Sequence, residues 1–344
     1  LAPLFLPEYA EFFGNSVALK VEGSREPDGR MALSDFAVTA KAIDLKGSLS
    51  LAAGGMPQAF DLTGRIAQAD GQPVLLPLTT DQPVRVQSAD IALSYDLAKG
   101  EGWKGAATVT GLDRADFRAS QLVLTGSGRI ARKAGGATFG GTLRFDAEGL
   151  DPTDPALARA LGAFVSGDGL VYMASGADSL TIPKLTLRGE DYAASVVAGR
   201  ISGLDDALQM AGQIEAQVED LSRFSGLAGQ PLAGSADLVL SGTGSPLTGA
   251  FDVQGTVAGT DLKTGVAQLD GLMAGRSAVA LSALRDKTGT TLRQLDLQAT
   301  SLSVKAQGKI ATAGSDLTAT LDFADLGVLG AGYGGAMQGQ AHIT

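Results

Sequence analysis

The sequence predicts an all-β fold: an elongated, antiparallel, repetitive sheet with a few short helices. Apolar and polar residues alternate with a period of two in many short segments, glycine-rich breaks separate these segments, and helical patterns are few. Neighbouring side chains of a strand point to opposite faces, so this alternation is typical of strands with one apolar and one polar face. Such one-sided strands favour an antiparallel sheet over a parallel sheet covered on both faces.

The clearest strand pattern spans residues 302–310, where Leu302, Val304 and Ile310 share one face and Lys305 lies on the other. The pattern recurs along the chain, and we take its apolar members as candidates for an inward, water-excluding face. These candidates are Leu143, Phe145, Leu185, Leu187, Ile214, Val218, Leu238, Leu240, Phe251, Val253, Val257, Leu295, Leu297, Leu302, Val304, Ile310, Leu317, Leu321 and Phe323.

Glycine pairs between the alternating runs predict turns, because glycine adopts the positive φ angles that tight turns need. The pairs are Gly54–Gly55, Gly135–Gly136, Gly140–Gly141, Gly334–Gly335 and the run 242–244. Strand, turn and strand then follow at intervals of about 10–15 residues, which is the spacing of an antiparallel array.

Three short segments carry helix signals. Residues 154–162 begin with Asp154 and Pro155 and end with glycine, and residues 219–227 begin with Asp220 as a candidate N-cap. The segment from Asp325 echoes the one from Asp220, 105 residues earlier, which predicts a repeated module. We expect one continuous segment over 1–344 with approximate modules 1–115, 116–219 and 220–324, and residues 325–344 beginning the next.

Composition argues against catalysis and against nucleic acid. The chain has one histidine, no cysteine and a net charge of −10, and it contains neither a phosphate-binding loop nor a nucleophile elbow. We therefore predict no enzyme activity, no catalytic residues, no cofactor, no metal site and no nucleic-acid partner. The carboxylates of Glu190 and Asp191 are interpreted as solvated turn charges, and Trp103 as a packing anchor at a strand edge rather than a ligand-stacking ring.

The apolar face itself is the remaining candidate for function. It combines Leu, Val and Ile with many Ala and Gly, and aromatic residues are only 5% of the chain. A closed core normally needs bulky side chains to reach native packing density, so these small residues leave space. Two arrangements remain open here: two sheets that bury this face against each other, or one curled sheet whose trough holds an acyl chain.

Several segments carry a family resemblance. Residues 220–224, 227–234 and 236–242, followed by 249–253, 261–265, 269–275 and the strands within 292–310, resemble the repeating unit of the TamB-type translocation and assembly proteins of the AsmA-like group. The match covers residues 97–344 best and is looser before them. The resemblance rests on the pattern of residue types and on their spacing, and it involves no catalytic signature.

The resemblance implies a taco-like β-groove that shields phospholipid acyl chains between the inner and outer membranes of a Gram-negative envelope. It implies a periplasmic location, an inner-membrane anchor outside this segment, a link to outer-membrane protein assembly, and an Omp85-type outer-membrane barrel partner reached through other parts. Since the sequence begins with Leu1, we expect a middle section of such a rod. The alternative is a structural or adhesive β-repeat array with a closed core and no lipid transport.

Overall fold

A computed structural model describes residues 10–78, 82–133, 136–204, 208–245, 247–311, 314–330 and 332–343. Across these residues, 22 strands form an open antiparallel β-sheet, and the helices are few and short. The predicted all-β, antiparallel fold class is confirmed. The chain divides into two compact units, which are described separately: unit 1 is Leu1–Asp154 with Leu161–Gly176, and unit 2 is Pro155–Ala160 with Ala177–Thr344. The module boundaries expected from the repeat stay a prediction.

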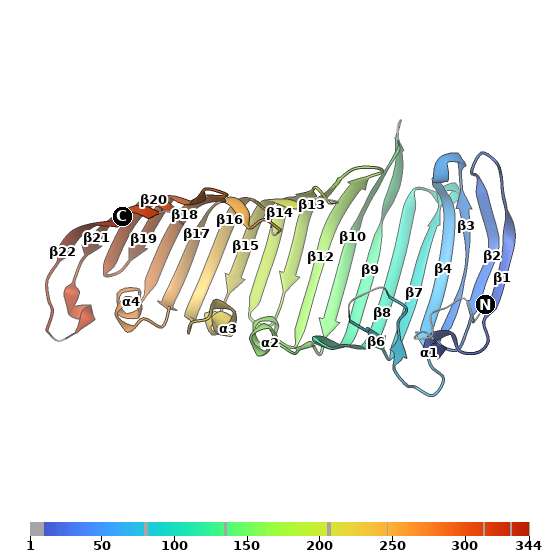
Figure 1. The fold of residues 1–344 in the computed structure, drawn as a ribbon, viewed down its shortest axis with the longest axis horizontal. Helices are drawn as coiled ribbons and strands as arrows, with labels where there is room; N and C mark the ends of the chain where they lie inside the picture. The colour runs from blue at the N-terminus through green and yellow to red at the C-terminus, as the bar shows by residue number, and fades with distance from the viewer. Residues whose placement is uncertain are drawn as a thin grey trace. The chain divides into compact units, whose positions relative to one another are not determined.

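Unit 1 is a single layer of antiparallel strands (Figure 1). Strands β1, β2, β3, β4, β7, β8, β9, β10 and β12 pair in that order. The β5–β6 hairpin joins β8 through β6, and β11 pairs with β9. The elements are α1 (Ala10–Phe13), β1 (Ala18–Arg25), β2 (Met31–Thr39), β3 (Ile43–Leu51), the 3-10 helix η3 (Ala53–Gly55), β4 (Pro57–Ala67), β5 (Val74–Leu75), β6 (Arg85–Val86), β7 (Ser88–Asp96), the 3-10 helix η4 (Leu97–Lys99), β8 (Gly102–Arg114), β9 (Phe117–Lys133), β10 (Gly136–Glu148), β11 (Asp151–Pro152) and β12 (Phe164–Ala174).

Unit 2 is a meander in which each strand from β13 to β21 pairs antiparallel with the next. Short helices lie along one edge of this sheet (Figure 1). The elements are α2 (Pro155–Leu161, of which residues 155–160 belong to this unit), β13 (Ser179–Arg188), β14 (Tyr192–Ser202), β15 (Gln209–Val218), the 3-10 helix η5 (Leu221–Phe224), α3 (Ser225–Ala228), β16 (Ala233–Ser245), β17 (Ala250–Lys263), α4 (Ala267–Leu272), β18 (Arg276–Asp286), β19 (Gly289–Ala299), β20 (Leu302–Ala311), β21 (Gly314–Phe323), the 3-10 helix η6 (Leu326–Leu329) and β22 (Met337–Ile343).

The helix predictions around Asp220 and Asp325 are confirmed, and the two segments share one local structure. The Asp220 carboxylate accepts the backbone N–H of Ser222 at 2.8 Å, and that of Asp325 accepts the N–H of Gly327 at 2.8 Å. Each aspartate thereby caps a single-turn 3-10 helix that follows a strand. The helix over 154–162 is confirmed as α2, whereas α4 carries no cap signal in the sequence and was not predicted.

Two of the glycine turn predictions are wrong. Gly140 and Gly141 lie within β10, and the run 242–244 lies within β16. Gly140, Gly141 and Gly242 are needed mid-strand because side chains or backbone of neighbouring strands occupy the place of a Cβ; at Gly140, for example, the ring of Tyr172 fills it. A Cβ on Gly244 would meet only ordinary contacts. The turns at Gly54–Gly55 and around Gly334–Gly335 lie outside the strands as predicted. Of the pair Gly135–Gly136, Gly135 lies outside the described residues and Gly136 begins β10.

Buried side chains in unit 1 form two small clusters. One packs Phe12 of α1 with Ala42, Val74 and Val86, each at most 2% exposed. The other contains Tyr95, Ile130 and Ala137, with Trp103 and other partly buried residues packed against them. Helix α1 and the β5–β6 hairpin thus cover one part of the apolar face, and the second cluster buries another. Elsewhere on this face, Ile91, Leu93 and Leu124 are 37–46% exposed.

Candidate functional site

Strand register in unit 2 brings the predicted apolar residues into continuous rows. Directly paired residues of an antiparallel sheet point to the same face, so a row can be followed from strand to strand. The first apolar row crosses all ten strands as Leu185, Val196, Ile214, Leu240, Gly255, Leu281, Leu295, Ala306, Ala319 and Ala341. The second runs beside it as Leu187, Ala194, Ala216, Leu238, Val257, Val279, Leu297, Val304, Leu321 and Gly339.

The remaining candidates of unit 2 share this face. Val218, Phe251, Val253, Leu302, Ile310, Leu317 and Phe323 follow the same alternation as the two rows on their strands. The row between the two apolar rows is mostly polar and belongs to the opposite face: Thr186, Ser195, Glu215, Val239, Thr256, Ala280, Asp296, Lys305, Thr320 and Gln340. The sheet therefore separates an apolar face from a polar face.

The two candidates in unit 1, Leu143 and Phe145, lie on an equivalent face. Leu143 heads a row that continues as Gly126, Gly105, Leu93, Leu62, Gly47, Phe36 and Val21. Phe145 heads a parallel row of Leu124, Ala107, Ile91, Gly64, Leu45, Val38 and Leu19. Each unit thus carries its own uninterrupted apolar face.

This apolar face is open rather than buried. Of the nineteen predicted residues, Leu302 is buried, Ile214 and Ile310 are 42% and 46% exposed, and the other sixteen are half-buried. Residues of a closed sandwich core would be almost fully buried, because two sheets packed face to face exclude water from between them. The described residues therefore fit a one-layer sheet with a half-open apolar face.

Trp103 shows how the face accommodates a large apolar group. Its indole lies over a floor of glycines, so that a Cβ on Gly126 would meet Trp103 Cη2 at 2.9 Å. The indole Nε1–H donates to the Gly140 carbonyl at 3.1 Å, which satisfies the ring's polar atom. The interpretation of Trp103 as a packing anchor is confirmed, and the glycines of β9 and β10 explain how it fits.

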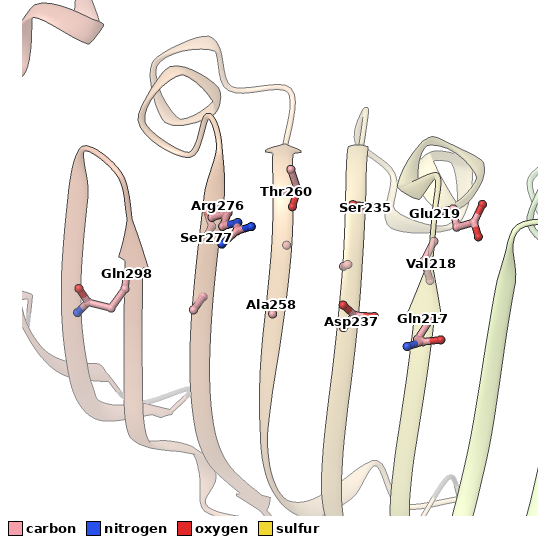
Figure 2. A pocket seen from close by; sticks show the side chains of 13 residues that line it. Gln217, Val218, Glu219, Ser235, Asp237, Ala258, Thr260, Arg276, Ser277 and Gln298 are labelled. Atoms are coloured by element: carbon pink, nitrogen blue, oxygen red, sulfur yellow. The ribbon is translucent and has the colours of Figure 1, made fainter.

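The polar face of unit 2 carries a shallow hollow across β15–β19 (Figure 2). The row Gln217, Asp237, Ala258, Ala278 and Gln298 crosses it, with alanines at the centre. These polar groups are exposed on separate strands, and they do not converge on one point as catalytic or metal-binding groups do. Among the described residues, no group of three or more His, Cys, Asp or Glu side chains could hold a metal ion.

The prediction of solvated turn charges holds for Glu190, whose side chain is 60% exposed, and is wrong for Asp191, whose side chain is 26% exposed. Both carboxylates pair with Arg223, whose side chain is only 10% exposed. The ion pair with Asp191 raises the pKa of the guanidinium, and burial raises the pKa of the Tyr192 hydroxyl beside it. Arg223 also donates to the Arg159 carbonyl of α2 at 3.0 Å and lies 5.6 Å from the centre of the Tyr192 ring. These contacts fasten α2 and η5 to the β13–β14 turn at one edge of the sheet.

Comparison with known proteins adds no assignment: no protein-family model, curated protein sequence or solved structure matches this chain. Within the described residues, no helix has both the length and the apolar character that a membrane crossing requires. The apolar faces of the two units are therefore the candidate functional element on structural grounds.

Proposed function

We propose that the apolar faces shield phospholipid acyl chains from water, in a periplasmic segment of an envelope-spanning protein that moves phospholipid between the inner and outer membranes. The observation that carries this proposal is the pair of unbroken apolar rows in unit 2, which cross ten strands and remain half-exposed. Removing a methylene group from water is worth ~0.8 kcal/mol. A continuous open apolar face can therefore hold an acyl chain along its whole length without any catalytic group.

The remaining parts of the proposal rest on the family resemblance. They are an inner-membrane anchor outside this segment, a link to outer-membrane protein assembly, and an Omp85-type barrel partner contacted by other parts of the protein. A structural or adhesive array is the competing function. It would have the apolar face filled by the protein's own side chains, as Trp103 fills it locally in unit 1.

A charge placed on the apolar face tests the proposal. We would incubate the 344-residue chain with phospholipid vesicles, purify it again and quantify the phospholipid that remains bound by phosphorus assay. Leu281→Asp introduces a carboxylate into the first apolar row, at a site already 36% exposed. Ala278→Asp places the same charge on the polar face of the same strand and is the matched control.

We expect bound phospholipid in the unaltered chain and in Ala278→Asp, and a clear loss in Leu281→Asp, because an ionised carboxylate is costly to bring into hydrocarbon. Circular dichroism would verify that both variants keep their strand content. Equal retention by all three proteins, or no phospholipid on the unaltered chain, would refute the proposal and favour the structural array.

A further inference from the structure

The apolar face of unit 2 is hollowed between β13 and β17. The hollow has a volume of about 560 Å³, and its apolar lining includes Ile182, Leu185, Met210, Ile214, Leu240, Phe251 and Val253. Small-molecule sites typically measure about 300–1,000 Å³ and are mostly apolar, so the hollow has the size and lining of such a site. Five of its lining residues are glycines: Gly199, Gly212, Gly242, Gly244 and Gly249.

The backbone keeps this hollow free of side chains. Gly212 and Gly242 face each other on β15 and β16, with φ angles of +149° and +151° that other residues rarely adopt. A Cβ on Gly242 would lie 2.8 Å from the Cα of Val253, so no larger residue fits there. In unit 1 a similar glycine floor is covered by Trp103, whereas the hollow of unit 2 is open.

A positively charged side chain lies beside the hollow. The row next to its glycines runs Met210, Gly244, Phe251, Arg285, Thr290 and Ile310. Arg285 is the charged residue in this row and pairs directly with Phe251, which lines the hollow. The described residues offer its exposed guanidinium no ion pair or hydrogen bond. A second arginine, Arg200, also lines the hollow, and its guanidinium donates to Ser179 Oγ at 3.3 Å.

The composition of the hollow favours a hydrocarbon chain with an anionic head. Strands β14–β17 each pair on both sides, so the floor has no free row of backbone N–H and C=O groups for an added peptide strand. A guanidinium presents a planar pair of N–H donors that match a phosphate group. The hollow would therefore take the tail, and Arg285 the head.

We infer that the hollow between β13 and β17 is a discrete seat for one phospholipid acyl chain, with the headgroup phosphate at Arg285. This inference rests on the proposed function and adds to it a fixed position and an orientation. Lipid held by such a seat is oriented with its phosphate on the β18 side.

The test measures the affinity of the 344-residue chain for a fluorescent parinaroyl phosphatidylglycerol and for the corresponding diacylglycerol, which lacks the phosphate. Gly244→Leu fills the hollow without a backbone clash, because a Cβ there would lie 3.6 Å from the nearest atom, the Ala250 carbonyl oxygen. Gly334→Leu adds the same side chain in the loop before β22, where a Cβ has nothing within 4 Å, and is its control. Arg285→Gln removes the cation, and Arg276→Gln on the polar face of the same strand is the matched control.

We expect Gly244→Leu to weaken binding of both lipids at least tenfold, since each methylene displaced into water costs about a factor of four. Arg285→Gln should weaken the binding of phosphatidylglycerol about fivefold, which corresponds to the strength of an exposed ion pair. It should leave the binding of diacylglycerol unchanged. Arg285→Lys should restore most of that loss. Thermal melting of each variant checks folding, and Met210→Gln, at a lining residue already 44% exposed, is a second way to weaken the seat.

The outcomes separate the seat from the general function. If Gly244→Leu and Met210→Gln bind both lipids like the unaltered chain while Leu281→Asp loses phospholipid, the proposed function stands and the discrete seat is refuted. If Arg285→Gln weakens the binding of both lipids equally, the placement of the headgroup phosphate at Arg285 is refuted. If the unaltered chain binds neither lipid, the proposed function itself fails.

Discussion

Exchanging Gly126 for alanine should reveal how tightly the glycine floor of unit 1 fits Trp103. The new methyl carbon would lie 2.9 Å from Trp103 Cη2 and 2.8 Å from Leu143 Cδ2, both closer than normal contact. Because the indole is held by the Nε1 hydrogen bond to Gly140, it cannot move away freely. Overpacking of this kind costs about 1–3 kcal/mol of unfolding free energy.

Gly126→Ala should lower the unfolding free energy much less in a protein that lacks the Trp103 indole. Trp103→Ala alone should destabilise the protein by about 3 kcal/mol, the lower end for a large aromatic side chain, because Trp103 is only half-buried. In the double variant the contacts with the indole are gone, and the nearest remaining contact of the methyl group is the flexible end of Leu143. The coupling energy between the two exchanges should therefore be at least ~1 kcal/mol.

Urea unfolding followed by circular dichroism measures the four proteins of this double-mutant cycle. Circular dichroism is needed because Trp103 is the single tryptophan of the chain and the variants remove it as a fluorescence probe. If the changes in unfolding free energy of the two single variants add up to that of the double variant within about 0.5 kcal/mol, the contact between the indole and the glycine floor does not determine stability, and the packing argument is refuted.

Three further predictions concern unit 2. Arg223→Met should lower the unfolding free energy by about 3 kcal/mol in a denaturant titration, because it leaves the partly buried Asp191 unpaired; a loss below 1 kcal/mol would contradict the edge-fastening role. The hydroxyl and backbone N–H of Ser222 lower the pKa of Asp220 below its usual 3.8, so this aspartate stabilises the fold above pH 3.8, and its contribution disappears as the pH falls through the lowered pKa. Asp220→Ala should therefore cost about 1 kcal/mol near neutral pH, and melting curves of the two proteins should converge once the pH lies below the lowered pKa of Asp220; a difference that persists there would exclude the capping carboxylate as its source. Gly242→Ala should melt well below the unaltered protein and Gly244→Ala should melt near it, so equal melting temperatures would contradict the backbone-contact argument.

The alternation of apolar and polar residues was sufficient to predict the strands and the shared face. Val304 and Lys305 lie on opposite faces because side chains alternate strictly along β20, which requires no knowledge of its neighbours. The capped turns after Asp220 and Asp325 were likewise predictable, since the aspartate and the N–H that it accepts are only two residues apart.

Features that depend on distant segments escaped the sequence analysis. Gly141 was taken for a turn because its requirement comes from Trp103, which lies on another strand. Asp191 was taken for a solvated charge because its partner, Arg223, is 32 residues away. The hollow was missed for the same reason, since Gly212 and Gly242 meet only through the pairing of β15 with β16. A mid-strand glycine in an otherwise alternating run is the signal that could have indicated such places.

Photo-crosslinking to phospholipid in cells that produce the protein tests the central claim most directly. A photoreactive residue would replace Val304 or Val253 on the apolar face, and Lys305 or Gln254 beside them on the polar face. Lipid adducts at Val304 and Val253 and none at Lys305 and Gln254 are the result that the account predicts. Absence of adducts at all four positions in the folded protein, or equal adducts on both faces, would contradict a lipid-shielding apolar face.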